Sequence, residues 1–184
     1  HLSIRRQRQM CIRDRANTTG AQNVAVGGVA LYTNTTSNYN TAIGDGALYT
    51  NAAASNTAVG ADALYANTTG TENVAVGAST LDANTTGTQN TGLGSSALGA
   101  NTTGTQNVAV GSSALIANTT ASYNVAVGRE ALITNTTGAS NVAIGTDALQ
   151  VNTTGAGNVA VGHDALDANT TASNNVAIGL DAMT

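Results

Sequence analysis

The sequence lacks several residue types on which most folded domains rely. Its 184 residues include no proline, phenylalanine, tryptophan or lysine, and charged residues make up only 9% of the chain. Proline cannot donate a hydrogen bond to a neighbouring strand, so its absence is compatible with an unbroken ladder of strands. Because the large aromatic side chains Phe and Trp are missing, we expect a thin hydrophobic core of aliphatic residues.

What the sequence does contain is a seventeen-residue pattern written ten times, once with one residue missing. One copy runs over residues 101–117 as N-T-T-G-T-Q-N-V-A-V-G-S-S-A-L-I-A, and the next copy starts at Asn118. A short fixed period is typical of a solenoid, in which each coil buries its apolar side against neighbouring coils. The pattern therefore predicts an all-β fold, a parallel β-roll or solenoid of ten seventeen-residue coils over residues 16–184.

Three positions of the repeat hardly change. An Asn precedes each apolar segment, a Gly follows four residues later, and a Leu follows that Gly by another four, with Met183 in its place in the last copy. We predict that these positions form structural ladders, and that the Asn side chains hydrogen bond to one another along the axis. The ladder positions are represented by Asn23, Gly27, Leu31, Asn107, Gly111, Leu115, Asn141, Gly145 and Leu149.

The segment N-V-A-V-G predicts one short strand in each coil. Val24 and Val26 would lie on one face of that strand, inside the coil, and Ala25 on the other. The Ala position is Ala nine times and Gly92 once, so we expect it to pack closely against a backbone outside the coil. A second strand is predicted at A-L-x-x, with Leu directed into the coil. Since one coil is thin, burial of the Ala face between three copies around an axis would stabilise it.

The motif N-V-A-V-G-x-x-A-L resembles the head repeats of trimeric autotransporter adhesins, and residues 141–145 and 175–179 come nearest to that family's pattern. The longer repeat is also similar to repeats of tail-fibre-like proteins that end in an intramolecular chaperone domain. The resemblance covers residues 16–184, and the seventeen-residue period is longer than that of the adhesin heads. It implies a left-handed, homotrimeric β-roll displayed outside the cell or on a virion.

From this resemblance we expect a non-enzymatic segment of a surface adhesin, extracellular at the outer membrane, that gives reach and multivalent display towards a host surface protein or glycan. A membrane would be reached only through an anchor domain elsewhere in the protein. The alternatives are a phage tail-fibre shaft and a free-standing solenoid that binds ice or glycans. An enzyme would require a further domain. No cofactor is expected.

Charge is distributed unevenly along the chain. Five of the six Arg residues fall in residues 1–15, so the repeats carry Arg129 against nine carboxylates, a net charge of 1 − 9 = −8. An acidic body of this kind is unsuited to binding nucleic acid. Residues 1–15 share nothing with the repeats; residues 10–15 look like a translated sequencing adapter. We interpret the segment as an assembly artefact, with a disordered basic arm as the alternative, and expect both ends of the repeat domain to be truncated.

The sequence offers several candidate sites. Tyr32, Tyr49 and Tyr65 share one column and could stack into a packing ladder or bind a sugar or a partner surface. Nine turns read N-T-T, a formal glycosylation sequon that we interpret as turn chemistry. An acidic column and the pair His163-Asp164 are interpreted as solvated groups, with neither a metal nor a catalytic role. Adjacent Thr pairs in turns do not match the alternating array that ice binding needs.

Overall fold

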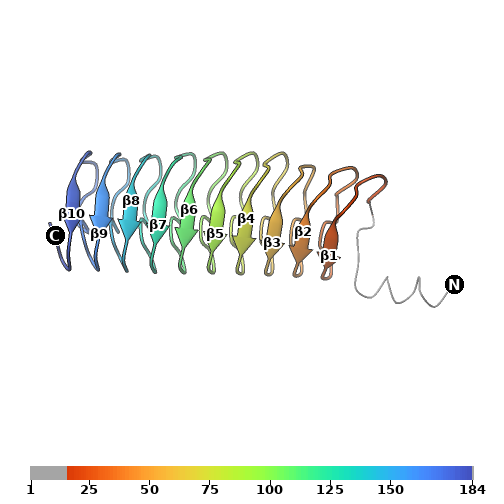
Figure 1. Ribbon diagram of the computed structural model, residues 1–184, viewed down its shortest axis with the longest axis horizontal. Helices are drawn as coiled ribbons and strands as arrows, with labels where there is room; N and C mark the ends of the chain where they lie inside the picture. The colour runs from red at the N-terminus through yellow and green to blue at the C-terminus, as the bar shows by residue number, and fades with distance from the viewer. Residues whose placement is uncertain (1–15, 184) are drawn as a thin grey trace.

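The structure, a computed structural model, describes residues 16–183, which form one row of stacked coils (Figure 1). The interpretations that concern residues 1–15 and Thr184 lie outside the described residues. Within residues 16–183 there are ten strands and no helix. The strands are β1 (Val24–Val26), β2 (Thr41–Ile43), β3 (Thr57–Val59), β4 (Val74–Val76), β5 (Thr91–Leu93), β6 (Val108–Val110), β7 (Val125–Val127), β8 (Val142–Ile144), β9 (Val159–Val161) and β10 (Val176–Ile178).

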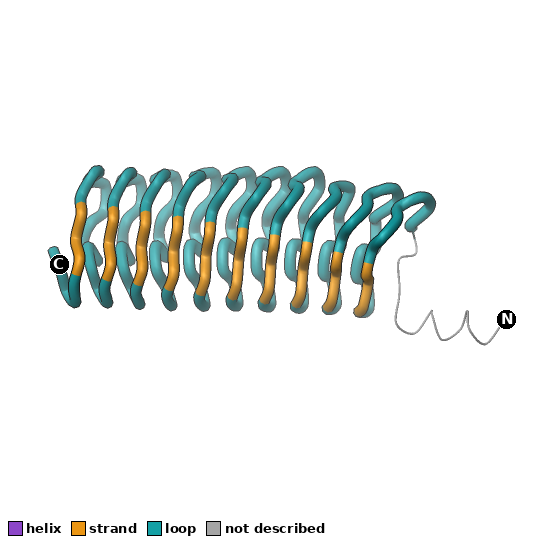
Figure 2. The backbone as a smooth tube through the Cα atoms, in the orientation of Figure 1, coloured by secondary structure: helices purple, strands orange, loops and turns teal. Residues whose placement is uncertain are grey.

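All ten strands belong to one parallel sheet whose order is the order of the sequence. Equivalent repeat positions are paired, as in Val108↔Val125 and Ala109↔Ala126 between β6 and β7. Figure 2 shows the strands aligned along one side of the rod, with the turns that close each coil behind and beyond them. The prediction of an all-β parallel solenoid is confirmed.

The second strand predicted at A-L-x-x is wrong, because these residues form a turn in every coil. Leu115 has a φ of 54°, and its equivalents, Met183 included, have φ between 50° and 57°. This left-handed backbone reverses the chain and cannot belong to an extended strand. The prediction that Leu points inward is confirmed, since Leu115 has no exposed surface.

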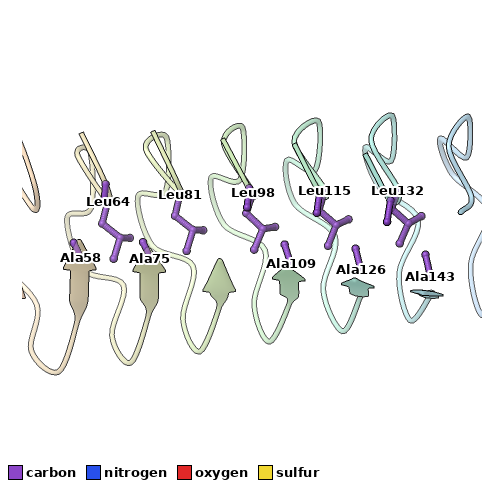
Figure 3. Packing of buried hydrophobic residues seen from close by; sticks show 14 of the residues in the cluster. Ala58, Leu64, Ala75, Leu81, Leu98, Ala109, Leu115, Ala126, Leu132 and Ala143 are labelled. Atoms are coloured by element: carbon purple, nitrogen blue, oxygen red, sulfur yellow. The ribbon is translucent and has the colours of Figure 1, made fainter. Parts of the chain in front are cut away.

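The two faces of the strand are the reverse of what the sequence suggested. Ala109 and Ala126 are completely buried within one chain, and Figure 3 shows these side chains directed toward the Leu side chains of the A-L turns. The residues on either side of each strand Ala lie on the outer face. For example, Val26, which follows Ala25 in β1, is 43% exposed. The coil is so narrow that the strand Ala fills the interior together with the Ala and Leu of the A-L turn, so the restriction to Ala arises inside one chain. The argument for an oligomer that was based on the Ala face is therefore wrong.

The one departure from Ala on the strand is compensated by a second departure. A Cβ atom added to Gly92 would lie 2.5 Å from Cγ2 of Thr80. Thr80 takes the place of the Ala that occupies this position in all nine other coils. Thr80 is completely buried, and its hydroxyl donates to the carbonyl oxygen of Gly94 at 2.6 Å. Core volume is thus conserved between the two positions, as close packing requires.

The invariant Gly after each strand allows adjacent coils to approach closely. Gly111 has a φ of 134°, and a Cβ atom there would overlap the carbonyl oxygen of Gly128 in the next coil. Only glycine combines this backbone conformation with that approach. The Gly column therefore fixes the contact between coils just where each strand ends.

Candidate functional site

The outer face of the sheet carries an uninterrupted line of aliphatic side chains, which we call the outer stripe. It consists of the third residue of every strand, always Val, Ile or Leu, flanked on the same face by the first residue, Val or Thr. In a single chain Ile43, Leu93 and Ile144 of this stripe are about two-fifths exposed. The members of its central line are Val26, Ile43, Val59, Val76, Leu93, Val110, Val127, Ile144, Val161 and Ile178.

Contiguous exposed apolar surface of this kind marks an interaction site in soluble proteins. With ten strands about 4.8 Å apart, the outer stripe is roughly 48 Å long. The column that precedes the conserved Asn borders it and contains polar side chains such as Glu72, Gln89 and Gln106, all exposed. A hydrophobic centre with a polar rim is the usual anatomy of a protein interface.

The conserved Asn before each strand forms a ladder along the axis. The side-chain oxygen of Asn107 accepts from the backbone amide of Asn124 at 3.0 Å, and its amide group donates to the carbonyl oxygen of Ala121 at 2.8 Å. The same amide group also lies 3.2 Å from Oδ1 of Asn90 in the preceding coil. Each Asn in this ladder therefore satisfies backbone groups that the narrow coil buries.

A second Asn ladder, which sequence reasoning missed, is formed by the first residue of N-T-T-G. Asn101 is completely buried, and its side-chain amide donates to Oδ1 of Asn84 at 2.8 Å and to the carbonyl oxygen of Gly104 at 3.1 Å. The constancy of this Asn was visible in the sequence, but it was interpreted as turn chemistry alone. Because Asn101 and its equivalents in the interior coils are buried and bonded, the folded turns of these coils do not present them for glycosylation.

The shortened third coil interrupts this second ladder. The amide of Asn51 donates to the carbonyl oxygen of Ala53 at 2.7 Å, within its own turn. The side-chain oxygen of Asn34, in the coil before, is left buried without a hydrogen-bond partner. Beyond the deletion the ladder resumes, since Asn67 donates to Asn51 Oδ1 at 2.8 Å. The deletion is accommodated at the cost of one axial hydrogen bond.

The three tyrosines predicted to share a column do stack. The ring centroids of Tyr32 and Tyr49 are 5.1 Å apart, those of Tyr49 and Tyr65 are 4.9 Å apart, and the ring planes are inclined by 1° and 6°. The spacing follows directly from the distance between parallel strands. The stack ends at Tyr65, because the next residue of the column is Asp82.

A cavity of about 320 Å³ opens where the tyrosine stack ends. Its lining comes from two columns in two successive coils: Asp62 and Tyr65 follow β3, and Ser79 and Asp82 follow β4. Burial raises the pKa of the Asp82 carboxyl above its ordinary value, and the charge of Asp62 adds to the effect, while the backbone amides of Ala83 and Asp82 oppose it. Sequence reasoning missed this site, although the change from Tyr to Asp in the column was a signal.

The Thr residues of the turns divide into two columns with different roles. The hydroxyl of Thr102, the first Thr of its turn, donates to the backbone carbonyl oxygen of Thr119 in the next coil at 3.0 Å. The second Thr, here Thr103, is exposed. One hydroxyl column therefore contributes to the stacking of the coils, and the other faces solvent.

A small group of charged residues lies in the turns after β7, β8 and β9. Ligand-type atoms of Asp147, His163 and Asp164 lie within 4.8 Å of one another. Arg129 binds Asp147 through a 3.1 Å contact, and His163 Nδ1 lies 2.8 Å from Asp164 Oδ2. Oδ2 of Asp147 and Oδ2 of Asp164 thus have partners within the chain, whereas Oδ1 of Asp147 is buried without one.

Searches of protein-family models, curated proteins and solved structures found no match to this chain. Among residues 16–183, the structure has no helix that is long and apolar enough to cross a lipid bilayer.

Proposed function

We propose that this chain is a non-enzymatic segment of a homotrimeric surface fibre, an adhesin displayed outside the cell, in which three left-handed rolls pack their outer stripes around a common axis. The observation that carries this proposal is the outer stripe itself: an aliphatic line that is present in every coil and is partly exposed in a single chain. The count of three and the hand of the coil rest on the resemblance to adhesin head repeats.

The geometry of the outer stripe favours a closed assembly of parallel copies. Every copy presents the same line of side chains at the same axial spacing, so copies can align along their whole length. Cyclic symmetry covers each stripe and leaves none free to recruit further chains. Burial of aliphatic surface supplies the driving force, at about 25 cal/mol per Å² of area removed from water.

Such a fibre would provide reach and multivalent display. The stacked coils give a rod of roughly 48 Å from these repeats alone. Exposed turns recur on every coil and on every subunit, so contacts with a host surface protein or glycan that are individually low in affinity can add together.

The first test is the mass of the chain in solution, measured by light scattering after size exclusion. We expect three times the 18.1 kDa of one chain. The double variant Val76→Lys/Val127→Lys should be monomeric with an unchanged β-type circular dichroism spectrum, because it places charges on the outer stripe. The matched control Thr86→Lys/Thr137→Lys adds the same charges to exposed turns and should stay trimeric. A folded, monomeric parent chain would overturn the proposal.

The alternative of a phage tail-fibre shaft shares this architecture, and the gene beyond the repeats distinguishes the two: a membrane-anchor domain favours the adhesin and a chaperone domain the tail fibre. A free-standing ice-binding solenoid is the less favoured alternative, because the first Thr of the turns is bonded to the next coil and leaves one exposed Thr column instead of an alternating array.

A further inference from the structure

The open end of the tyrosine stack has the composition of a binding site. Tyr49 covers one face of the Tyr65 ring at a centroid distance of 4.9 Å. In the following coil the column continues with Asp82, so no fourth ring lies against Tyr65, and the cavity of about 320 Å³ occupies this position. An aromatic ring, two carboxylates and the hydroxyl of Ser79 therefore surround one space.

The walls of this cavity are held in place by the coil-to-coil hydrogen bonds. The amide of Ser79 donates to the carbonyl oxygen of Ala61 at 2.9 Å, and the amide of Ala66 donates to that of Asp82 at 3.0 Å. Asp62 and Ser79 also share the left-handed backbone of their column, with φ of 55° and 53°. Because the backbone on both sides is fixed, a ligand would meet a preformed site and lose little free energy in ordering it.

The charge of the site favours a cation. Asp62 and Asp82 line the same cavity, and the repeats contain no lysine and only one arginine, Arg129, which pairs with Glu130 and Asp147. No basic side chain of the described repeats is therefore at hand to neutralise the two carboxylates. The raised pKa of Asp82 agrees with an uncompensated site, since burial and the Asp62 charge both disfavour its ionised form.

We propose that the cavity bounded by Asp62, Tyr65, Ser79 and Asp82 binds a guanidinium group, which stacks on the free face of the Tyr65 ring and donates hydrogen bonds to the two carboxylates. A guanidinium is planar, matches carboxylate geometry with paired N–H donors and stacks on aromatic faces. A neutral sugar could also stack on Tyr65, but it would leave the charges of Asp62 and Asp82 uncompensated. This inference does not depend on the assembly proposed above.

The experiment is a titration of the full chain with ethylguanidinium, followed through the tyrosine ring signals in NMR spectra. The chain has five tyrosines and no Phe or Trp, so few ring signals occur in the aromatic region. We expect the Tyr65 signals to shift in a saturable way, and those of Tyr39 and Tyr123, which are exposed in another column, to stay in place. Methyl glucoside is the neutral comparison ligand and should cause no saturable shift.

Two variants and a matched control locate the site. Tyr65→Leu should weaken binding roughly 2- to 30-fold, the range expected for loss of a cation–π contact. Asp82→Asn should weaken binding as well. The matched control is Asp167→Asn, because Asp167 occupies the same column but is preceded in it by Gln150 where Asp82 is preceded by Tyr65; this variant should leave affinity unchanged. Affinity should also fall as the pH is lowered through the raised pKa of Asp82.

A second arm uses a short arginine peptide, acetyl-Gly-Arg-Gly-amide, and distinguishes a small cation from the side chain of a protein partner. Equal affinity for ethylguanidinium and the peptide indicates a site for the guanidinium group alone, and tighter peptide binding indicates a protein partner; both support the proposal. A saturable response to methyl glucoside without one to ethylguanidinium would overturn it. Equal losses in Asp82→Asn and Asp167→Asn, or no binding of either guanidinium probe, would overturn it as well.

Discussion

The inner and outer positions of the same three-residue strand are both occupied by small aliphatic residues, yet for different reasons. Ala109 faces the Leu column and has no exposed surface, and substitution at this position elsewhere in the chain occurs only with a compensating change at Thr80. Val110 faces outward, and its column admits Val, Ile and Leu freely. Restriction in size marks the inside of the coil, and restriction only to aliphatic character marks the outside.

The difference teaches how to interpret small residues in a narrow solenoid. A column that contains only Ala or Gly suggests close contact with another backbone. From the sequence alone, that contact is predicted to be with a second subunit. In a coil with a single Leu per turn, that contact is internal. The property that points to a partner is instead the persistence of exposed aliphatic side chains on the outer stripe.

The sharpest test of the comparison is to shorten one side chain inside the coil and one side chain of the outer stripe. Leu115→Ala should lower the free energy of unfolding by about 2–5 kcal/mol, because the rigid coils on either side cannot collapse into the cavity. Val110→Ala shortens a partly exposed side chain by the equivalent of two CH₂ groups, each worth about 0.8 kcal/mol at full burial, and should cost less than Leu115→Ala. Urea unfolding of both variants, in the Val76→Lys/Val127→Lys chain that we expect to be monomeric, measures the difference. Equal losses would show that the two faces are not distinct.

The compensated pair in the core gives the next largest effect. Gly92→Ala alone should destabilise the chain by about 1–3 kcal/mol, since the new Cβ atom meets Thr80. Adding Thr80→Ala restores the Ala-Ala arrangement of the other coils and should recover most of the loss. A double-mutant cycle measured by urea unfolding checks this, and additive effects of the two substitutions would contradict it.

The Asn ladders extend the comparison from apolar to polar groups. Asn107→Ala leaves the amide of Asn124 and the carbonyl of Ala121 without their partners, and Asn101→Ala breaks the second ladder. Each should cost about 1–3 kcal/mol because buried polar groups become unsatisfied. Thermal melting of both variants beside the exposed control Thr103→Ala tests this. An unchanged melting temperature for Asn107→Ala would count against a structural role for the ladder.

The smallest effect is expected at the partly buried carboxylate Asp82. Its folded-state pKa lies above the ordinary value of 3.8, so its contribution to stability is present below that value and is lost as the pH rises through the folded-state pKa. Asp82→Asn should therefore be slightly more stable than the parent chain at neutral pH. The gain should disappear when the pH falls below about 3.8. Melting curves across this pH range measure the difference, and a gain independent of pH would assign it to another cause.

Much of the fold could be predicted because the sequence repeats. The period of seventeen residues implied a parallel solenoid, and the alternation Val-Ala-Val implied a strand at the right three residues of each coil. The sequence predicted a second strand at the A-L segment, where the structure has a turn. Its left-handed φ depends on the need to reverse the chain within a narrow coil, and local residue preferences do not reveal that.

The candidate sites were predictable in part. The tyrosine column was evident, and so was its spacing, because identical columns in a parallel solenoid lie one strand apart. The cavity was not, since it depends on how Asp62, Tyr65, Ser79 and Asp82 of two successive coils surround one space. The buried Asn of N-T-T-G was likewise hidden by its occurrence in a segment whose other residues are typical of exposed turns.

The sequence by itself determined the number of coils, the parallel register and the columns of like residues, because a fixed period brings equivalent positions together whatever the detailed path of the coil. Only the tertiary structure decided which columns face inward. That choice depends on the diameter of the coil, since a space filled by one Leu and two Ala side chains turns the Val side chains out, where they form the outer stripe.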